Sequence, residues 1–171
     1  AIQTTLARLG MPEARFVVQL TPAPALTPTG DDEIDFLFTA NGNFAPQKVE
    51  RIASGGEISR VMLALKALLA HRMELPTIIF DEIDTGVSGR IADAMGEIIA
   101  DLSQTMQVVD ITHLPQVASK GAAHFVVYKR DGRTDITRLT DEERITEIAK
   151  MLSGSRITDA AIAQARILLG K

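Results

Sequence analysis

The spacing of apolar residues changes along this chain, and the change separates two kinds of secondary structure. Apolar and polar residues alternate in Arg15–Leu20 and in Glu33–Thr39, which predicts two strands. The Pro- and Thr-rich run Thr21–Gly30 between them predicts a turn, so we expect an antiparallel pair at the edge of a sheet. Residues 1–14 are predicted to be the end of a helix, stopped by a glycine and a proline.

From residue 54 onwards, helical and strand patterns alternate. Ser54 and Glu57 have the spacing of a capping box, which opens an almost wholly apolar helix that we expect to be buried. Thr77–Phe80 and Met106–Ile111 are continuous apolar runs, the pattern of central strands in a parallel sheet. The other expected elements are helices over 88–103, 141–152 and 158–169, a short helix through 117–118, and a hairpin of His124–Arg130 and Arg133–Leu139 around Asp131-Gly132.

These elements predict an α/β fold with a mostly parallel sheet, flanking helices, an antiparallel edge and a hairpin. The 171 residues fit one domain, and 46% hydrophobic with 23% charged residues excludes disorder or a coiled coil alone. The apolar stretches are shorter than the ~18–20 residues that cross a bilayer, and no signal peptide opens the chain, so we expect no membrane partner. The lack of cysteine fits the cytoplasm. A net charge of −4 argues against wrapping nucleic acid unaided.

Two acidic residues follow the first of the apolar strands. Asp81 and Glu82 come directly after Thr77–Phe80, which is the shape of a Walker B motif. In such a motif the first carboxylate can hold Mg²⁺ and the second can orient or deprotonate an attacking water. The alternative is that both residues begin an ordinary polar loop.

A second candidate is the glycine-rich start of the apolar helix. Gly55 and Gly56 would expose backbone N–H groups at a helix N-terminus, where the helix dipole favours a phosphate. The alternative is a capped helix with no ligand.

The third candidate is His113, which follows the strand Met106–Ile111. If the two apolar strands are parallel neighbours, His113 lies at the same carboxyl edge as Asp81 and Glu82, where open α/β sheets bind ligands. A lone histidine at a strand end is usually structural, and we interpret His71 and His124 in that way. Asp110 interrupts the strand and has no role that the sequence explains.

Taken in order, these motifs resemble those of ABC-type ATPase heads: a signature motif, Walker B, a D-loop and an H-loop. Longer strings resemble the SMC-like ATPases of bacterial DNA repair, and the resemblance covers most of residues 31–169. The strings are Ser-Gly-Gly-Glu-Ile-Ser-Arg from Ser54, Phe-Asp-Glu-Ile-Asp-Thr-Gly-Val-Ser-Gly-Arg from Phe80, and Ile-Thr-His-Leu-Pro-Gln-Val-Ala from Ile111, with weaker likeness at 129–134 and 141–154. Ala53 departs from the general signature, which has a leucine that packs rather than binds.

The resemblance implies a role for each matching residue. Asp81 would hold Mg²⁺, Glu82 would be the catalytic base, and His113 would sense the γ-phosphate. The helix start would close over the γ-phosphate of an ATP bound to the opposite subunit, and the D-loop would cross the dimer seam. The residues of these two nucleotide-facing segments are Ser54, Gly55, Gly56, Glu57 and Asp84.

One expected motif is missing. No Gly-x-x-x-x-Gly-Lys-Ser/Thr occurs, so the chain has no phosphate-cradling loop, and no segment before residue 54 supplies a glutamine loop. In SMC-like proteins a long coiled coil separates the two lobes of the head. The resemblance therefore implies that residues 1–14 end the returning coiled-coil helix and that 15–171 form the C-terminal lobe of a P-loop NTPase head.

The implied function is that of half an ATPase. The lobe would be inactive alone and would hydrolyse ATP with Mg²⁺ only when joined to its N-terminal lobe and engaged with a second head. The intact protein would bind DNA and act in double-strand break repair and recombination, in the bacterial cytoplasm at the nucleoid. Two alternatives are a non-catalytic binding or dimerisation lobe and the head of another SMC-like or ABC ATPase.

The predicted hairpin is basic. Lys129, Arg130, Arg133 and Arg138 could meet a phosphate of DNA or nucleotide, or they could form a solvated hairpin tip.

Overall fold

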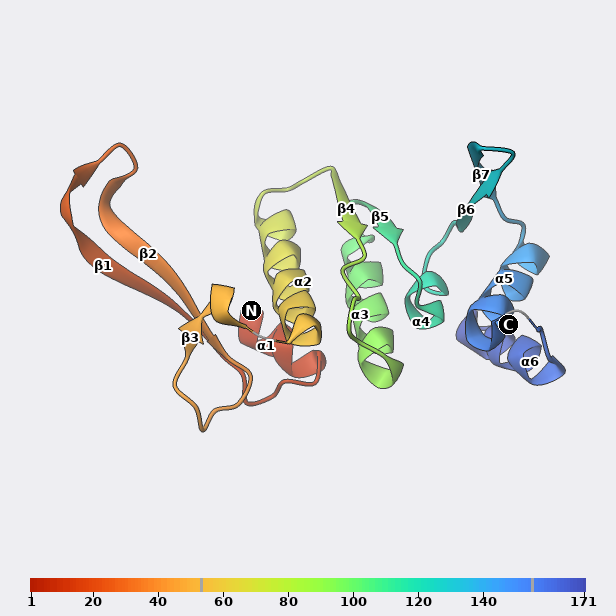
Figure 1. Ribbon diagram of the computed structural model, residues 1–171, viewed down its shortest axis with the longest axis horizontal. Coiled ribbons are helices and arrows are strands. Elements are labelled where there is room, and N and C mark those ends of the chain that lie inside the picture. Colours follow the sequence, from red (N-terminus) through yellow and green to blue (C-terminus); the bar gives the residue numbers. More distant parts are fainter. Residues whose placement is uncertain (53, 155) are drawn as a thin grey trace. The chain divides into compact units, whose positions relative to one another are not determined.

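The computed structural model describes residues 1–52, 54–154 and 156–171 (Figure 1). The chain divides into two compact units. Unit 1 contains residues 1–74 and 83–87, and unit 2 contains residues 75–82 and 88–171. The short segment 83–87 therefore belongs to unit 1, although the chain on either side of it belongs to unit 2.

Unit 1 combines two helices with an antiparallel sheet whose strand order is β1-β2-β3. Its elements are α1 (Ile2–Arg8), β1 (Arg15–Thr27), β2 (Gly30–Thr39), β3 (Gln47–Lys48), a 3-10 turn (Val49–Arg51) and α2 (Gly55–Arg72). The helices and the strand pair are those that the sequence predicts.

The strand pair is longer than expected, because the predicted turn over Thr21–Gly30 is wrong. Most of that segment is strand, and the connection between β1 and β2 is confined to residues 28–29. The pairing runs regularly from Arg15 to Pro22 and shifts between Pro22 and Thr27. Proline is tolerated here because β1 lies at the edge of the sheet, where half of its backbone N–H groups have no strand to bond.

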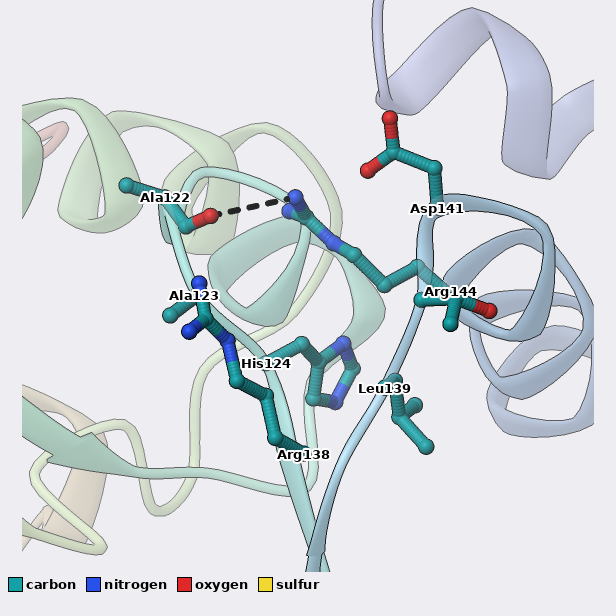
Figure 2. A pocket seen from close by; sticks show the side chains of 8 residues that line it. Ala122, Ala123, His124, Arg138, Leu139, Asp141 and Arg144 are labelled. Atoms are coloured by element: carbon teal, nitrogen blue, oxygen red, sulfur yellow. Dashed lines mark hydrogen bonds between the residues drawn. The ribbon is translucent and has the colours of Figure 1, made fainter.

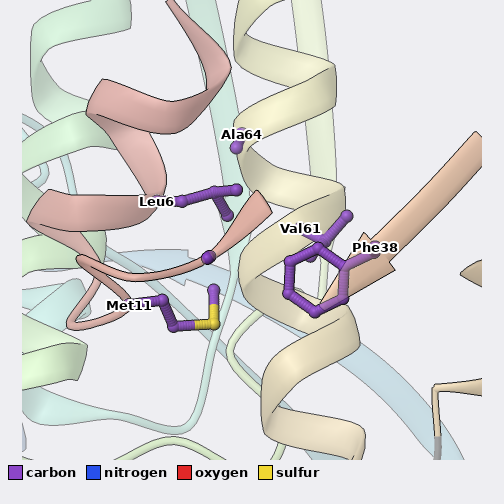
Figure 3. Close-up of a cluster of buried hydrophobic side chains, with 6 residues drawn as sticks. Leu6, Met11, Phe38, Val61 and Ala64 are labelled. Atoms are coloured by element: carbon purple, nitrogen blue, oxygen red, sulfur yellow. The ribbon is translucent and has the colours of Figure 1, made fainter. Parts of the chain in front are cut away.

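The core of unit 1 lies between α1, α2 and the end of β2 (Figure 3). Leu6 of α1 packs with Val61 and Ala64 of α2, and Met11 and Phe38 close the cluster. The expectation that the whole of α2 is buried is wrong, since Leu69 near its C-terminal end is exposed.

Unit 2 begins with alternating strands and helices and ends with a hairpin and two helices. Its elements are β4 (Thr77–Asp81), α3 (Gly89–Leu102), β5 (Gln107–Ile111), α4 (Pro115–Ala118), β6 (Phe125–Arg130), β7 (Arg133–Arg138), α5 (Asp141–Ser153) and α6 (Asp159–Leu168). All of these were predicted from the sequence within a few residues.

Strands β4 and β5 are parallel and pair in register from Thr77 with Gln107 to Asp81 with Ile111. Among the described residues no other strand joins this pair. The expectation of buried central strands is therefore wrong for this chain: Phe80 is fully buried, but Ile79 is 60% and Ile111 is 52% exposed. Parallel sheets are ordinarily covered on both faces. The two strands are therefore as apolar as central strands of a sheet, but they lack the neighbouring strands that central strands have.

The C-terminal part of unit 2 follows the predicted pattern closely. Asp131 and Gly132 both have positive φ, at 50° and 76°, as a two-residue type I′ turn between β6 and β7 requires. Helix α5 opens with a complete capping box of Thr140 and Glu143 and packs on α6 through Ile148 and its neighbours. No helix in the described part of the chain is long and apolar enough to cross a membrane.

Candidate functional site

The predicted catalytic residues lie at one end of the β4–β5 pair. Asp81 is the last residue of β4 and pairs with Ile111, and the Glu82 backbone N–H donates to the Ile111 carbonyl oxygen at 3.0 Å. Because β5 runs parallel to β4, His113 follows Ile111 at the same edge. The side chains of Asp81, Glu82 and His113 are all exposed, as groups that meet a ligand must be.

Glu82 has an uncommon backbone conformation. Its φ is +47°, in the left-handed region, which costs a non-glycine residue about 1–2 kcal/mol. The bond to the Ile111 carbonyl holds the residue there, so pairing with β5 offsets the strain. Such strain concentrates at functional sites, and no signal in the sequence predicts it.

The loop that carries His113 is held on both sides. The Thr112 hydroxyl accepts a hydrogen bond from the Leu114 backbone N–H at 2.9 Å, and Pro115 then begins α4. These constraints present His113 on a short, fixed turn immediately beyond β5.

The acidic residues at this edge suit a magnesium ion that a nucleotide shares. Among the described residues there is no group of three or more His, Cys, Asp or Glu side chains that could hold a metal alone. Mg²⁺ usually takes one or two carboxylates, with phosphate oxygens and waters completing its shell. One exposed carboxylate at a strand end, Asp81, fits that kind of site.

The helix start lies in unit 1, and its two glycines have different surroundings. Ser54 is the N-cap of α2, and its hydroxyl accepts a hydrogen bond from the Glu57 backbone N–H at 3.4 Å. A Cβ on Gly55 would meet nothing within 4 Å, so this residue is open to an approaching ligand. A Cβ on Gly56 would lie 2.5 Å from the Gly86 carbonyl oxygen, so Gly56 serves a contact within unit 1.

The loop 84–87 packs against this helix start. Asp84 is only 1% exposed, whereas Thr85 and Gly86 are exposed. Thr85 and Gly86 are thus the exposed part of this loop, and the place of Asp84 at a dimer seam stays a prediction. The Ser59 hydroxyl donates to the Thr85 carbonyl oxygen at 2.9 Å. Sequence reasoning missed Ser59, because a serine inside a helix carries no signal of a distant partner.

A pocket of about 370 Å³ lies elsewhere in unit 2 (Figure 2). Asp81, Glu82 and His113 do not line it, but Arg138, one of the basic residues predicted to meet a phosphate, does. The Arg144 guanidinium crosses it and donates to the carbonyl oxygens of Gly121 and Ala122. Burial, with a smaller contribution from the charge of Arg144, lowers the pKa of His124 below its usual 6.5. The lining residues are Ala122, Ala123, His124, Arg138, Leu139, Thr140, Asp141 and Arg144.

The remaining predicted features are placed as follows. The basic residues Lys129, Arg130, Arg133 and Arg138 are all exposed on the β6–β7 hairpin, and contact with a phosphate of DNA or nucleotide stays a prediction. Asp110 is partly buried and lies across the ladder from Phe80. Ala53, the departure from the general signature motif, lies outside the described residues.

Comparison with known proteins gives a consistent result. No protein-family model matches the chain. The chain is similar to DNA repair proteins named RecN: it is 40% identical to that of Rickettsia felis over 173 residues, 39% to that of Haemophilus influenzae over 173 residues, and 43% to that of Bacillus subtilis over 148 residues. These alignments cover 99%, 98% and 84% of the chain but 32%, 31% and 26% of the relatives. The chain thus spans about a third of the length of the curated relatives it matches.

Solved structures confirm the fold. A chain from work on ATP-driven dimerization and DNA stimulated activation of SMC ATPases superposes with a TM-score of 0.67 at 19% identity, covering 91% of both chains. The Smc head domain with a coiled coil and joint from Pyrococcus yayanosii superposes with a TM-score of 0.72 at 18% identity, covering 89% of this chain and 28% of that one. The α/β fold is therefore that of SMC head domains, as the motif order predicts.

Proposed function

We propose that the chain is the C-terminal lobe of an SMC-like ATPase head, because 98–99% of it aligns with about a third of the length of RecN DNA repair proteins. In this proposal residues 1–14 end a coiled-coil helix, 15–171 form the lobe, and a separate N-terminal lobe supplies the phosphate loop. The intact protein uses ATP to engage two heads during DNA double-strand break repair, in the bacterial cytoplasm at the nucleoid.

The observation that carries this proposal is the incomplete parallel sheet. Ile79, Val109 and Ile111 are apolar and exposed on one face of a two-stranded parallel pair, whereas Phe80 on the opposite face is buried. The pair therefore leaves in water an apolar face that a parallel sheet ordinarily covers. The same pair ends in the three residues that match catalytic motifs, and the sequence contains no phosphate loop. A second lobe that covers the pair would supply the missing loop and bury these side chains together.

The proposed chemistry follows from the residues at the carboxyl end of the β4–β5 pair and from those at the start of α2. Asp81 would hold Mg²⁺, which would supply charge neutralisation for the phosphates. Glu82 accepts a proton from the attacking water, and His113 donates a hydrogen bond to the γ-phosphate. The helix start from Ser54 offers its free backbone N–H groups to the phosphate of the second head.

Reconstitution tests the proposal. We expect no ATP turnover by the pure chain, turnover after mixing with the N-terminal lobe, and a loss of at least about 100-fold with Glu82→Gln, the scale of general-base catalysis. Glu74→Gln is a matched control, because Glu74 is also an exposed glutamate with positive φ, at 50°, but lies outside the motifs.

Three outcomes would count against this assignment. Turnover by the chain alone would show that the lobe is complete without a partner. Equal activity of the Glu82→Gln and Glu74→Gln heads would show that Glu82 is not the catalytic base. Association of the two lobes without any hydrolysis would favour the alternative of a non-catalytic binding lobe.

A further inference from the structure

The start of α2 contacts the loop 84–87 inside unit 1 through a close backbone approach and a hydrogen bond, among other interactions. The first is steric: the backbones of Gly56 and Gly86 approach so closely that a Cβ on either residue would lie under 3 Å from a backbone atom of the other. Gly86 has φ +77°, so its turn also requires a glycine.

The second contact is the hydrogen bond from the Ser59 hydroxyl to the Thr85 carbonyl oxygen, 2.9 Å long. Ser59 follows Gly56 by three residues and therefore lies on the same face of α2. The residue is 9% exposed, so water does not readily replace the bond.

The two contacts restrain the position of the loop in different ways. The glycine contact limits how close the segments come, but dispersion between two glycines attracts only weakly and in no particular direction. The hydroxyl bond is directional, so it sets where the loop lies along the helix and resists its withdrawal.

We propose that Ser59 is a positioning residue that holds Thr85 and Gly86 in register with the helix start at Ser54 and Gly55. The two segments then present one preformed edge to the nucleotide of the second head, and neither moves without the other. This inference rests on the proposed function for its consequence in catalysis, but the coupling of the two segments is a property of unit 1 itself.

In the head formed with the N-terminal lobe, we expect Ser59→Ala to lower kcat about threefold to tenfold, the scale of one lost hydrogen bond. The KM for ATP stays unchanged, because the other lobe holds most of the nucleotide and the edge acts only after head engagement. Ser59→Thr keeps the hydroxyl and restores kcat. A purely structural role would leave kcat per folded head unaltered.

Ser119→Ala is the matched control. Ser119 is 7% exposed, and its hydroxyl donates to the Gln116 carbonyl oxygen at 3.0 Å. The variant therefore loses a hydroxyl–carbonyl bond of similar length and burial that is local to the end of α4 and far from both segments in sequence. We expect it to lose similar stability and to keep the wild-type kcat. Equal kcat values for the Ser59→Ala and Ser119→Ala heads would overturn the proposal.

Amide hydrogen exchange of the chain alone separates this inference from the proposed function. The Val87 backbone N–H donates to the Asp84 carbonyl oxygen at 3.3 Å and reports on closure of the loop. Ser59→Ala should speed its exchange about threefold to tenfold and Ser119→Ala should not. Unchanged Val87 exchange in Ser59→Ala overturns the coupling even if the head hydrolyses ATP, whereas faster exchange without any hydrolysis by the wild-type head refutes only the proposed function.

Discussion

Replacing Gly56 by alanine measures how tightly the helix start and the loop 84–87 are packed. The added carbon would lie 2.5 Å from the Gly86 carbonyl oxygen and 3.2 Å from its carbonyl carbon, where ordinary contact begins at 3.4 Å. The neighbouring atoms are backbone and cannot rotate away. Overpacking of this kind costs about 1–3 kcal/mol, and a clash with backbone favours the upper end. Gly56 has no positive φ, so the cost comes from packing alone.

Gly55→Ala provides the control, because the same methyl group one residue earlier meets nothing within 4 Å. We expect this variant to be stabilised by about 0.5 kcal/mol through the lower entropy of its unfolded chain. Equilibrium urea unfolding of the two variants and the wild-type chain gives the comparison. A Gly56→Ala chain within about 0.5 kcal/mol of Gly55→Ala would refute the reasoning, since it would mean that Gly56 and Gly86 are not in contact.

Two further predictions concern unit 2. The lowered pKa of His124 means that the unfolded chain takes up a proton below pH 6.5 before the folded chain does, so the free energy of unfolding falls as the pH drops through this window. When the free energy of unfolding in urea is measured at several pH values below 6.5, it should change less steeply with pH in His124→Gln than in the wild-type chain. Equal pH dependence in the two chains would show that His124 does not cause the effect. Charge reversal of Arg130 and Arg133, which are exposed on the hairpin, should leave ATP and DNA affinity of the intact protein unchanged if the tip is only solvated. A loss of DNA binding that depends on salt would instead identify phosphate contacts.

The secondary structure was largely predictable because its signals are local. The alternation in β1 and β2, the Asp131-Gly132 turn and the Thr140 cap depend on residues two to four positions apart. The error over Thr21–Gly30 has a tertiary cause. Proline argues against a strand only where its missing N–H is needed, and the edge position of β1 removes that need.

The candidate site was predictable in part for a similar reason. Asp81 and Glu82 follow one apolar run directly and His113 follows another after one residue, so their place at a strand end follows once β4 and β5 are parallel neighbours. The left-handed backbone of Glu82 could not be predicted, because it depends on the bond to the Ile111 carbonyl oxygen of another strand. The catalytic roles of these residues stay predictions, which reconstitution with the proposed N-terminal lobe tests.

The sequence by itself determined most of the helices and strands, though not the strand over Thr21–Thr27, together with the order of the motifs and the lack of a phosphate-loop motif in the sequence. Only the tertiary structure decided that Gly55 is open while Gly56 is closed against Gly86, that Ser59 holds Thr85, and that Ile79 is exposed. The physical reason is distance along the chain. Short-range patterns set local conformation, but a contact between residues 26 positions apart forms only when the packing of a whole unit brings them together.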